Sequence, residues 1–568
     1  MLTNIKYRKS LFVATAVCLS CLTMVACKKS QGLAEDPYAG GKKVLGITFI
    51  SKTTDPDIVN AGATLNLMVN GLMKYKDNFK LYVNEIEAEV LNYTDSTIQF
   101  KVPLTASTGS VWVTSQDQSF FGPIVKIGGK VSVDPSFKIV NGAGRTPEGG
   151  GTTVYDAEVL PSGRFWLAGA FSSFEQKGTD ALPNGGLVQT DPDGGYIITD
   201  VEFGMGVVGG SRTIYSINRI TTGTHSGKYI IAGNFRSYNS RRPNRQILNN
   251  ITRLNDRGRL DTVKTADMDP SGNSLVPIVN PKPEQTWKNQ DTVAAFNAGV
   301  DGTVRKTFIL GEQVYIVGNF QNFKRIYYPN STYDEKVYDV TRMRQMVRVN
   351  SDGSMDSTFH YNKVTRQSAA GGNGAILDAL MQADGKLILV GSFSTFNGVV
   401  ANRIVRLNLD GSVDQSFNAG VGADGDVYSV RYNASTNKIV IAGSFRTFNG
   451  KASSGLALLN ADGSTVSTFI GESISGGITT FAGQLNNGKI IVAGSFNKYG
   501  TYLRQGFMIL EANGQLAVGY NNTGGFQGRI YDMIETTAPN GSKVVLVGDI
   551  IRFNAMLPHN VLRLIISN

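Results

Sequence analysis

The chain has 568 residues, of which 41% are hydrophobic, 18% charged and 9% aromatic, and it carries a formal net charge of +10. Glycine accounts for 65 of these 568 residues, about 11%, compared with roughly 7% in an average protein. So few charges exclude a coiled coil or a charge-rich disordered chain. So much glycine favours an all-β protein with many tight turns, because glycine adopts the positive φ that hairpin turns require.

Residues 1–26 have the pattern of a secretory signal peptide. Three basic residues within the first nine precede an apolar run over residues 11–22, which is shorter than the ~20 residues that a membrane-spanning helix needs. The sequence Met24-Val-Ala-Cys27 then resembles a bacterial lipobox. This resemblance implies cleavage before Cys27 and attachment of lipid to it, whereas the alternative is an ordinary signal peptide with an incidental cysteine.

We therefore expect a lipoprotein anchored in the bacterial outer membrane, and the sequence leaves open whether it faces the cell surface or the periplasm. All three cysteines lie at or before Cys27, so the exported chain has no intramolecular disulfide and depends on burial and strand pairing for its stability. Residues 27–43 lack apolar periodicity and contain three glycines and a proline, which predicts a flexible tether.

The charge of the exported chain is mild. Because the first 26 residues contain three basic residues and no acidic one, cleavage lowers the net charge from +10 to +7. A nucleic-acid-binding protein concentrates lysine and arginine on one face, whereas the basic clusters here are short. We expect no nucleic-acid partner, and expect the membrane to be contacted through the N-terminal lipid.

Residues 44–127 predict a small β-sandwich. Four segments alternate apolar and polar residues, as half-buried strands do, at residues 65–69, 79–83, 97–102 and 110–114. Their order and the turns between them resemble an IPT/TIG domain, an immunoglobulin-like sandwich, and this resemblance implies a spacer in a cell-surface protein. Trp112 lies between two valines of the last segment, and we expect it in the sandwich core.

The rest of the chain repeats. Apolar β-forming residues followed by Gly-x-aromatic, or an equivalent, recur seven times, with the glycine at positions 169, 233, 318, 391, 443, 494 and 548. A second phrase, clearest at Arg403–Asp410, and a third, clearest at Val413–Phe417, follow in most repeats. Each repeat predicts about four short strands with Asp-Gly or Asn-Gly at a tight turn, which is typical of a propeller blade.

The two ends of the repeat region predict how the propeller closes. Residues 561–566 match the second phrase, and the third phrase that would follow is found instead near the start, at Val133-Asp-Pro-Ser-Phe137. We expect this N-terminal strand to complete the last blade and leave no open edge. The seven glycine phrases predict seven blades over residues 131–568, with six or eight as alternatives.

The repeat phrases resemble the delta-60 repeat family, a bacterial β-propeller of unknown function, most closely over residues 376–470. This resemblance implies a fold and no particular chemistry. With the lipobox and the IPT/TIG-like domain, the whole chain resembles an uncharacterised lipoprotein of the Bacteroidetes type.

No signature of catalysis or metal binding stands out. The three histidines are far apart, no cysteine follows Cys27, and His-Glu-x-x-His, a nucleophile elbow and a complete P-loop are all missing from the sequence. We therefore expect no metal and no cofactor, and we single out no catalytic residue. Pairs of carboxylates from different blades remain open, because spacing along the chain does not reveal them.

Ligand-binding residues are best sought where the repeats differ. The repeated phenylalanines share one position and are expected to pack between blades. Two irregular segments, residues 262–292 and 324–344, contain aromatic residues among polar ones, which suits stacking on sugars or protein hot spots. The candidates are Trp287, Tyr327, Tyr328 and Tyr333. The alternative is that these segments fold back on the propeller.

Together these features favour a non-enzymatic, lipid-anchored binding or scaffolding protein of the cell envelope, with a propeller face presented to a glycan or a protein. A propeller hydrolase or lyase acting on a polysaccharide is one alternative. A structural adhesion protein is another.

Overall fold

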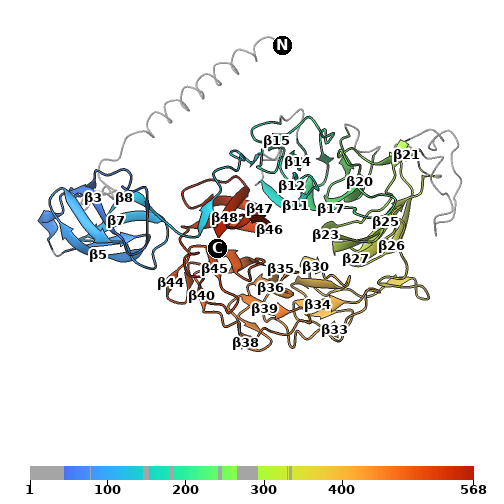
Figure 1. The fold of residues 1–568 in the computed structure, drawn as a ribbon. Helices are drawn as coiled ribbons and strands as arrows, with labels where there is room; N and C mark the ends of the chain where they lie inside the picture. The colour runs from blue at the N-terminus through green and yellow to red at the C-terminus, as the bar shows by residue number, and fades with distance from the viewer. Residues whose placement is uncertain are drawn as a thin grey trace, which may run out of the picture. The chain divides into compact units, whose positions relative to one another are not determined.

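The structure, a computed structural model, describes residues 44–76, 78–144, 152–178, 184–240, 246–264, 292–328, 331 and 335–568. Among these, every regular element is a β-strand except one 3-10 turn, η1 (Met73–Tyr75), so the all-β class is confirmed (Figure 1). The described part of the chain contains no helix long and apolar enough to cross a membrane.

The first eight strands form a β-sandwich. They are β1 (Thr48–Phe49), β2 (Ile58–Val59), β3 (Thr64–Asn70), β4 (Phe79–Val83), β5 (Ile86–Tyr93), β6 (Thr97–Lys101), β7 (Gly109–Ser115) and β8 (Gln118–Ile127). Their order is β1-β3-β6-β5-β4-β7-β8-β2. The long strand β5 pairs with β4 through its first half and with β6 through its second half, which lets one strand serve both layers.

Alternation along the strands builds the core of the sandwich. In β3, Leu65, Leu67 and Val69 are buried while the residues between them are exposed. The same alternation buries Val111 and Val113 of β7 and turns Trp112 to the opposite face, so the expectation that Trp112 lies in the core is wrong. There its ring stacks on that of Tyr82, with 4.4 Å between centroids.

Beyond residue 130, seven sheets of the described chain share one plan, and we number them blades 1 to 7 in chain order. Their first strands are β11 (Thr153–Val159), β17 (Thr213–Arg219), β23 (Thr303–Leu310), β30 (Ile376–Met381), β35 (Val427–Asn433), β41 (Thr479–Gln484) and β46 (Phe526–Ala538). Their second strands are β12 (Phe165–Ala170), β18 (Tyr229–Asn234), β24 (Gln313–Asn319), β31 (Leu387–Gly391), β36 (Lys438–Gly443), β42 (Ile490–Gly494) and β47 (Gly541–Phe553). Their third strands are β14 (Leu187–Thr190), β20 (Ile251–Leu254), β27 (Met346–Val349), β34 (Ile404–Leu407), β39 (Leu456–Asn460), β45 (Phe507–Leu510) and β48 (Val561–Ser567).

Shorter strands form the periphery of the blades. They are β10 (Ala143–Gly144), β13 (Ser173–Phe174), β15 (Tyr196–Ile197), β16 (Val207–Val208), β19 (Ser237–Tyr238), β21 (Thr262–Lys264), β22 (Thr292–Ala294), β25 (Asn322–Ile326), β26 (Tyr338–Arg342), β28 (Tyr361–Asn362), β29 (Gln367–Ser368), β32 (Thr395–Phe396), β33 (Val399–Val400), β37 (Thr447–Phe448), β38 (Lys451–Ala452), β40 (Ile474–Ser475), β43 (Lys498–Tyr499) and β44 (Tyr502–Leu503). Most pair two by two as small antiparallel ribbons.

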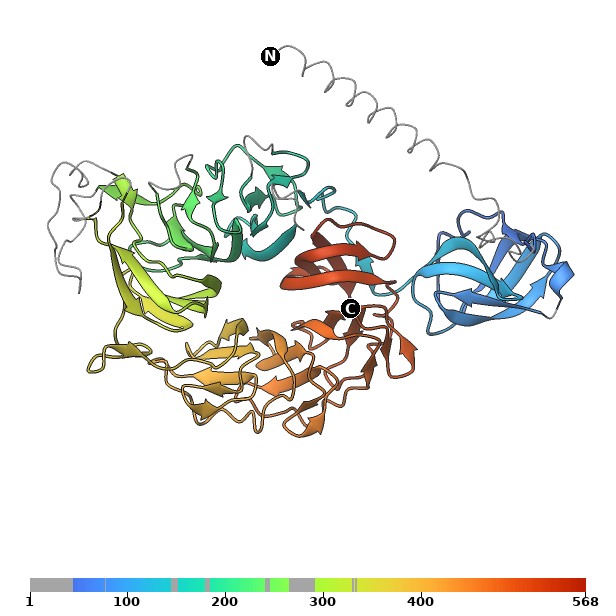
Figure 2. The same ribbon diagram turned by 180° about the vertical axis from the view of Figure 1, so that it is seen from behind.

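The blades form a closed ring. The first strand of each blade contacts the first strand of the next, and β46 of blade 7 contacts β11 of blade 1. The remaining strand, β9 (Val131–Val133), pairs with β48 as the outermost strand of blade 7. Figure 2 shows this cyan segment beside the red strands of blade 7. The predicted closure by an N-terminal strand is confirmed.

The repeated phenylalanines pack between blades, as expected. Phe445 of blade 5, for example, belongs to one apolar cluster with Leu380 and Ile388 of blade 4. It is 1% exposed, and its counterparts in blades 1 to 6 are equally enclosed. Because each blade is apolar on both faces, this packing is what holds neighbouring blades together.

The glycine of the first repeat phrase has a steric cause. At Gly443 a Cβ atom would overlap the carbonyl oxygen of Asp426, two residues before the bulge in the preceding strand β35. The same clash with the first strand of the blade arises at the corresponding glycine of all seven blades. A residue without a Cβ is therefore required there, which explains why the phrase keeps glycine while its neighbours vary.

Candidate functional site

One bulged residue from each blade faces a common cavity. In the pairing of every first strand with its second strand the register shifts by one residue. The extra residues are Tyr155, Tyr215, Arg305, Leu377, Tyr428, Thr480 and Tyr531. A bulge re-aims a side chain, and all seven of these line one cavity of about 180 Å³. We call this cavity the channel site.

Aromatic rings form a continuous wall on one side of the channel site. The ring centroid of Tyr155 lies 4.5 Å from that of Tyr215 and 4.7 Å from that of Tyr531. The guanidinium of Arg305 lies 4.8 Å from the Tyr215 centroid, close enough for a cation–π contact. Burial, followed by the neighbouring tyrosines, raises the pKa of Tyr155, so its hydroxyl stays neutral near pH 7.

Charged residues on the first strands link different blades, Lys306 of blade 3 with Asp156 of blade 1 and Arg431 of blade 5 with Asp378 of blade 4. Lys306 Nζ lies 3.2 Å from Asp156 Oδ1, and Arg431 Nη1 lies 2.5 Å from Asp378 Oδ2. The other oxygen of Asp156 accepts the N–H of Ile217 in the next blade at 2.9 Å. These carboxylates are therefore held by cations and by backbone donors of adjacent blades.

Burial and the neighbouring charges together shift the pKa values of these ionisable groups. Burial and then the charge of Asp156 raise the pKa of Asp532. Burial alone would lower the pKa of Lys306, but Asp156 and Asp532 outweigh it and raise the pKa, so Lys306 remains a cation. Glu158, further along β11, has its pKa raised to about 7 by burial and then by Asp156.

The channel site therefore combines aromatic faces with positive charge. Arg305 is the one charged residue among the seven at the bulges, and Arg529 also lines the cavity. Aromatic faces suit the C–H face of a sugar, and guanidinium groups suit a carboxylate or phosphate. Among the described residues, no group of three His, Cys, Asp or Glu side chains is placed to hold a metal ion.

The residues singled out from the sequence lie elsewhere. Cys27, Trp287 and Tyr333 fall outside the described residues, so their roles stay predictions. Tyr328, just after β25, is 8% exposed and packs with Val293 and Ile326, which leaves its ring little surface for a ligand. The carbonyl of neighbouring Tyr327, which is partly exposed, accepts a hydrogen bond from Ser331 Oγ at 2.8 Å.

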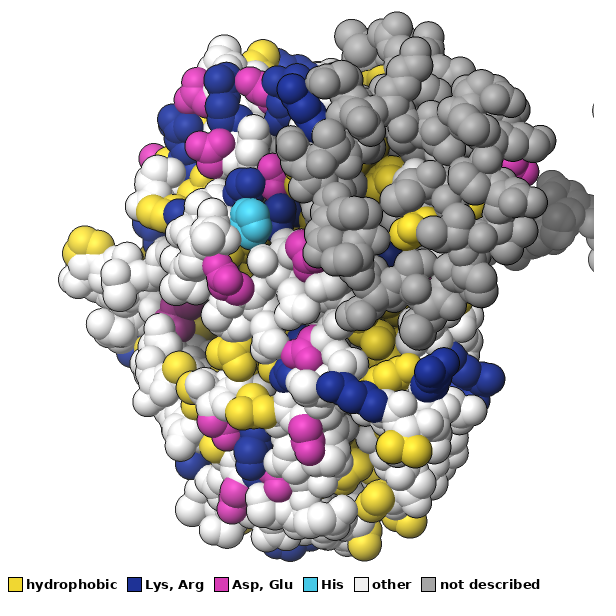
Figure 3. All heavy atoms as spheres, turned by 90° about the vertical axis from the view of Figure 1, so that its right-hand side faces the viewer, with side chains coloured by type: hydrophobic (Ala, Val, Ile, Leu, Met, Phe, Trp, Pro, Cys, Tyr) yellow, Lys and Arg dark blue, Asp and Glu magenta, His cyan; other side chains and the backbone are white. Residues whose placement is uncertain are grey.

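The channel residues were not identified from the sequence, although a signal exists. They occupy one equivalent position in seven otherwise similar repeats, and four of the seven are tyrosine. The bulge position can be recognised only once the pairing register of the first and second strands is known. On the face shown in Figure 3, lysine and arginine side chains are interspersed with acidic ones rather than gathered in one basic surface.

Comparison with known families supports the propeller. Residues 382–417, 434–469 and 485–516, in blades 4 to 6, match the model described as a domain of unknown function (DUF5122) beta-propeller. Residues 21–123 match a second domain of unknown function, DUF5008. The chain is thus similar to DUF5122 propellers over three repeats, in keeping with the delta-60 resemblance. No curated protein matches the chain.

Solved structures give remote matches. A structural genomics protein of unknown function from Bacteroides thetaiotaomicron is 10% identical, with 91% of this chain and 97% of that chain covered and a TM-score of 0.29. The WD40 propeller domain of Doa1 is 12% identical, with 75% and 96% covered and a TM-score of 0.35. Rhamnogalacturonan lyase YesW is 12% identical, with 92% and 89% covered and a TM-score of 0.29.

Proposed function

We propose that this protein is a lipid-anchored binding protein of the bacterial cell envelope, and that its channel site takes a sugar residue carrying an anionic group. The observation that carries the proposal is the convergence of all seven bulged residues on one cavity lined by four tyrosines and Arg305. The side chains at this position face the cavity rather than the contacts between blades, so packing between blades does not explain the four tyrosines and the arginine.

The size and chemistry of the cavity narrow the ligand. At about 180 Å³, it is smaller than the 300–1,000 Å³ of pockets for drug-sized ligands, so one ring enters rather than an oligosaccharide. The rings of Tyr531, Tyr155 and Tyr215 offer stacking faces. Arg305 and Arg529 offer donors to a carboxylate, which favours a uronic acid over a neutral sugar.

Binding without cleavage fits the carboxylates better than hydrolysis does. Asp378, which lines the cavity, pairs with Arg431 and also accepts the N–H of Val430 at 3.0 Å. A carboxylate held by these two partners stabilises the contact between blades of the propeller and is poorly placed to act as a catalytic acid or base. Product analysis after incubation with pectin and alginate tests the alternative of a polysaccharide hydrolase or lyase, for which we expect no release of oligosaccharides.

Isothermal titration calorimetry of the chain without its signal peptide tests the proposed ligand class. We expect galacturonic or glucuronic acid oligomers to bind and neutral glucose oligomers to bind at least tenfold more weakly. Arg305→Gln should remove this preference, and Tyr155→Ala should weaken both. Tyr502→Ala, at a tyrosine that is 43% exposed on β44, is the matched control. Equal binding of acidic and neutral sugars would exclude the anionic class, and no binding at all would exclude the site.

The proposal also includes a lipid anchor at Cys27 and a position at the outer membrane. The lipobox ending at Cys27 supports attachment to the outer membrane, on either its outer or its inner face. Digestion of the protein by protease on intact cells would place the propeller outside, and digestion only after lysis would place it in the periplasm. An outside location makes extracellular polysaccharide the first ligand to screen.

A further inference from the structure

In four blades, an arginine on the third strand forms a buried ion pair with an aspartate. In blade 4, Arg406 Nε donates to Asp414 Oδ2 at 2.8 Å, and the guanidinium lies 4.8 Å from the Phe417 centroid. Its Nη1 donates to the carbonyl of Ala461 in the next blade at 2.8 Å. Equivalent pairs join Arg253 to Asp261, Arg348 to Asp356 and Arg563 to Asp134.

Blade 5 departs from this pattern at several positions together. Leu458 stands in place of the arginine and Val466 in place of the aspartate. Two residues after the phrase-ending phenylalanine, Gly471 replaces the buried alanine that blade 4 has as Ala419. Every change removes volume or charge from the same region, between blade 5 and blade 6.

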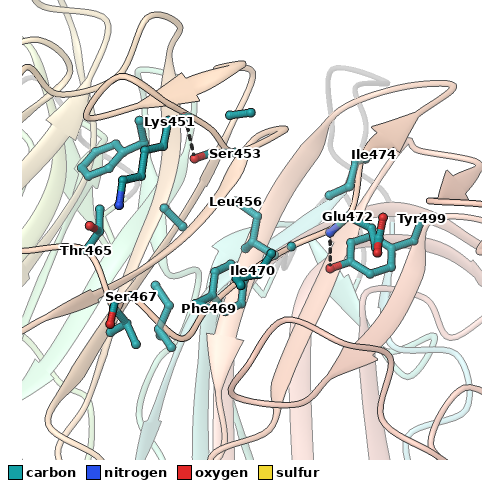
Figure 4. A pocket seen from close by; sticks show the side chains of 16 residues that line it. Lys451, Ser453, Leu456, Thr465, Ser467, Phe469, Ile470, Glu472, Ile474 and Tyr499 are labelled. Carbon is teal, nitrogen blue, oxygen red and sulfur yellow. Dashed lines mark hydrogen bonds between the residues drawn. The ribbon is translucent and has the colours of Figure 1, made fainter.

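The result is a pocket of about 320 Å³, shown in Figure 4. Its lining includes the apolar side chains of Leu456, Leu458, Phe469 and Ile474. The hydroxyl of Tyr499 fixes one wall, because it accepts the N–H of Glu472 at 2.9 Å and donates to the carbonyl of Gly514. We call this the blade 5–6 pocket.

Blade 6 shows that loss of the ion pair does not by itself open a pocket. There Ile509 and Ala517 stand at the two positions, yet both are buried, and Tyr520 is 4% exposed in the same apolar cluster. Lys489 lies 4.8 Å from the Tyr520 centroid. The open space in blade 5 therefore depends on more than the missing ion pair, and the smaller Gly471 contributes to it.

Two opposite charges border the blade 5–6 pocket. Lys451, on β38, and Glu472 lie on opposite sides of it, with Leu456, Phe469 and Ile470 between them (Figure 4). Within the described ranges, neither Lys451 nor Glu472 forms an ion pair with another side chain. The pocket therefore combines apolar side chains with polar ones and has an unpaired charge of each sign at its edges.

We propose that the blade 5–6 pocket binds a short zwitterionic peptide with apolar side chains. The ammonium group pairs with Glu472, the carboxylate pairs with Lys451, and the side chains occupy the apolar lining. The volume, at the lower end of the range for ligand pockets, suits a dipeptide. This site is separate from the channel site and does not depend on the function proposed for it.

Calorimetry with leucyl-leucine, on the chain without its signal peptide, tests the proposal. We expect measurable binding, with affinity at least tenfold lower for N-acetyl-leucyl-leucine and for leucyl-leucine amide, each of which lacks one charge. Lys451→Met and Glu472→Gln should each weaken binding of leucyl-leucine by a similar factor. Lys498→Met, at an exposed lysine on β43, is the matched control and should leave affinity unchanged.

Refilling the pocket gives an independent test. Leu458→Arg with Val466→Asp restores the ion pair of the other blades and should abolish binding while the unfolding temperature is maintained. If the double variant does not fold, Gly471→Ala takes its place. The added Cβ would make only ordinary contacts, the nearest at 3.4 Å to Tyr499 Oη, so the variant should fold. Because the methyl group occupies part of the pocket, Gly471→Ala should weaken binding. Absence of leucyl-leucine binding, equal binding of the capped peptides, or full binding by a folded refilled variant would each overturn the proposal.

Discussion

Arg563 Nε donates to Asp134 Oδ2 at 2.8 Å, although 429 residues separate them in the chain. Arg563 lies in β48, the third strand of blade 7, and Asp134 directly follows β9. Within blades 2, 3 and 4 the same pair forms over eight residues. The closing blade thus repeats the internal chemistry of the others with residues drawn from both ends of the propeller.

Breaking this pair should destabilise the propeller strongly. Burial alone would raise the pKa of Asp134, but hydrogen bonds from Ser136 and Lys543 and the charge of Arg563 lower it to about 2. Arg563→Leu removes one of the two cations that pair with Asp134, a carboxylate that is 3% exposed, and we expect a loss of about 3 kcal/mol in the free energy of unfolding. Urea denaturation at pH 7 measures it.

The double variant is the sharper comparison. Arg563→Leu with Asp134→Val copies the residues that blade 5 has at Leu458 and Val466, so it should recover more than half of the loss. Arg164→Leu, which breaks the exposed pair with Asp200, should cost less than about 0.5 kcal/mol. A double variant no more stable than the single one would contradict this account.

The glycine of the repeat phrase should not tolerate a methyl group. Gly443→Ala would place Cβ against the carbonyl oxygen of Asp426, and its nearest neighbours are all backbone atoms of Asp426 and Val427, which cannot turn aside as a flexible side chain could. We expect a loss of about 3 kcal/mol or more in unfolding free energy, as for overpacked core sites. Gly471→Ala is the control, since its Cβ would meet only ordinary contacts. Equal stability of the two variants would show that the steric explanation is wrong.

Glu158 should make stability depend on pH near neutrality. Its pKa is raised to about 7 in the folded chain, above the ~4.3 of an unfolded chain, so its contribution is fully present below that lower value and is lost as pH rises through 7. We expect wild type to lose on the order of 2 kcal/mol between pH 5 and 8 relative to Glu158→Gln.

His360 makes the comparison with Glu158→Gln necessary. Burial lowers the pKa of His360 to about 4, so its contribution is complete above the unfolded value of ~6.5 and is lost as pH falls through 4. Between pH 5 and 6.5 it acts against the trend from Glu158. Urea midpoints of both proteins at each pH isolate the Glu158 contribution, and identical pH profiles would exclude it.

Cys27 should be the site of lipid attachment. Cells grown with a clickable palmitate analogue should label the protein, and Cys27→Ser should abolish the label and release the protein from the membrane fraction. Cys21→Ser, within the apolar run of the same segment, is the control and should retain the label. Absence of label from the wild-type protein would point to an ordinary signal peptide, and label that survives Cys27→Ser would show that another residue carries the lipid.

Much of the fold could be predicted because the same short sequence phrases recur along the chain. Gly443 and Phe445 recur with their neighbours in blade after blade, and period, turn residues and apolar strands together identify a propeller. The third phrase at Val133–Phe137 predicted the closing strand, since a fragment that completes a repeat must pair with the repeat that lacks it.

The channel site could not be predicted in the same way. Whether Tyr155 faces the cavity depends on a one-residue register shift between β11 and β12, and such a shift is decided by pairing rather than by local sequence. Trp112 shows the same limit, because alternation alone does not say which face of a strand is buried. Tyr328 lies in an irregular segment, where no period indicates burial.

The strand β9 also decides where a mechanical load enters the propeller. In chain order the sandwich precedes β9, and β9 is held in blade 7 by three residue pairs with β48 and by the Asp134 ion pair that follows. If the proposed lipid holds the N-terminus and a ligand pulls on the propeller, the tension reaches the contact between β9 and β48 before any other strand of the ring. The contact that completes the propeller is therefore also the one that must resist shear.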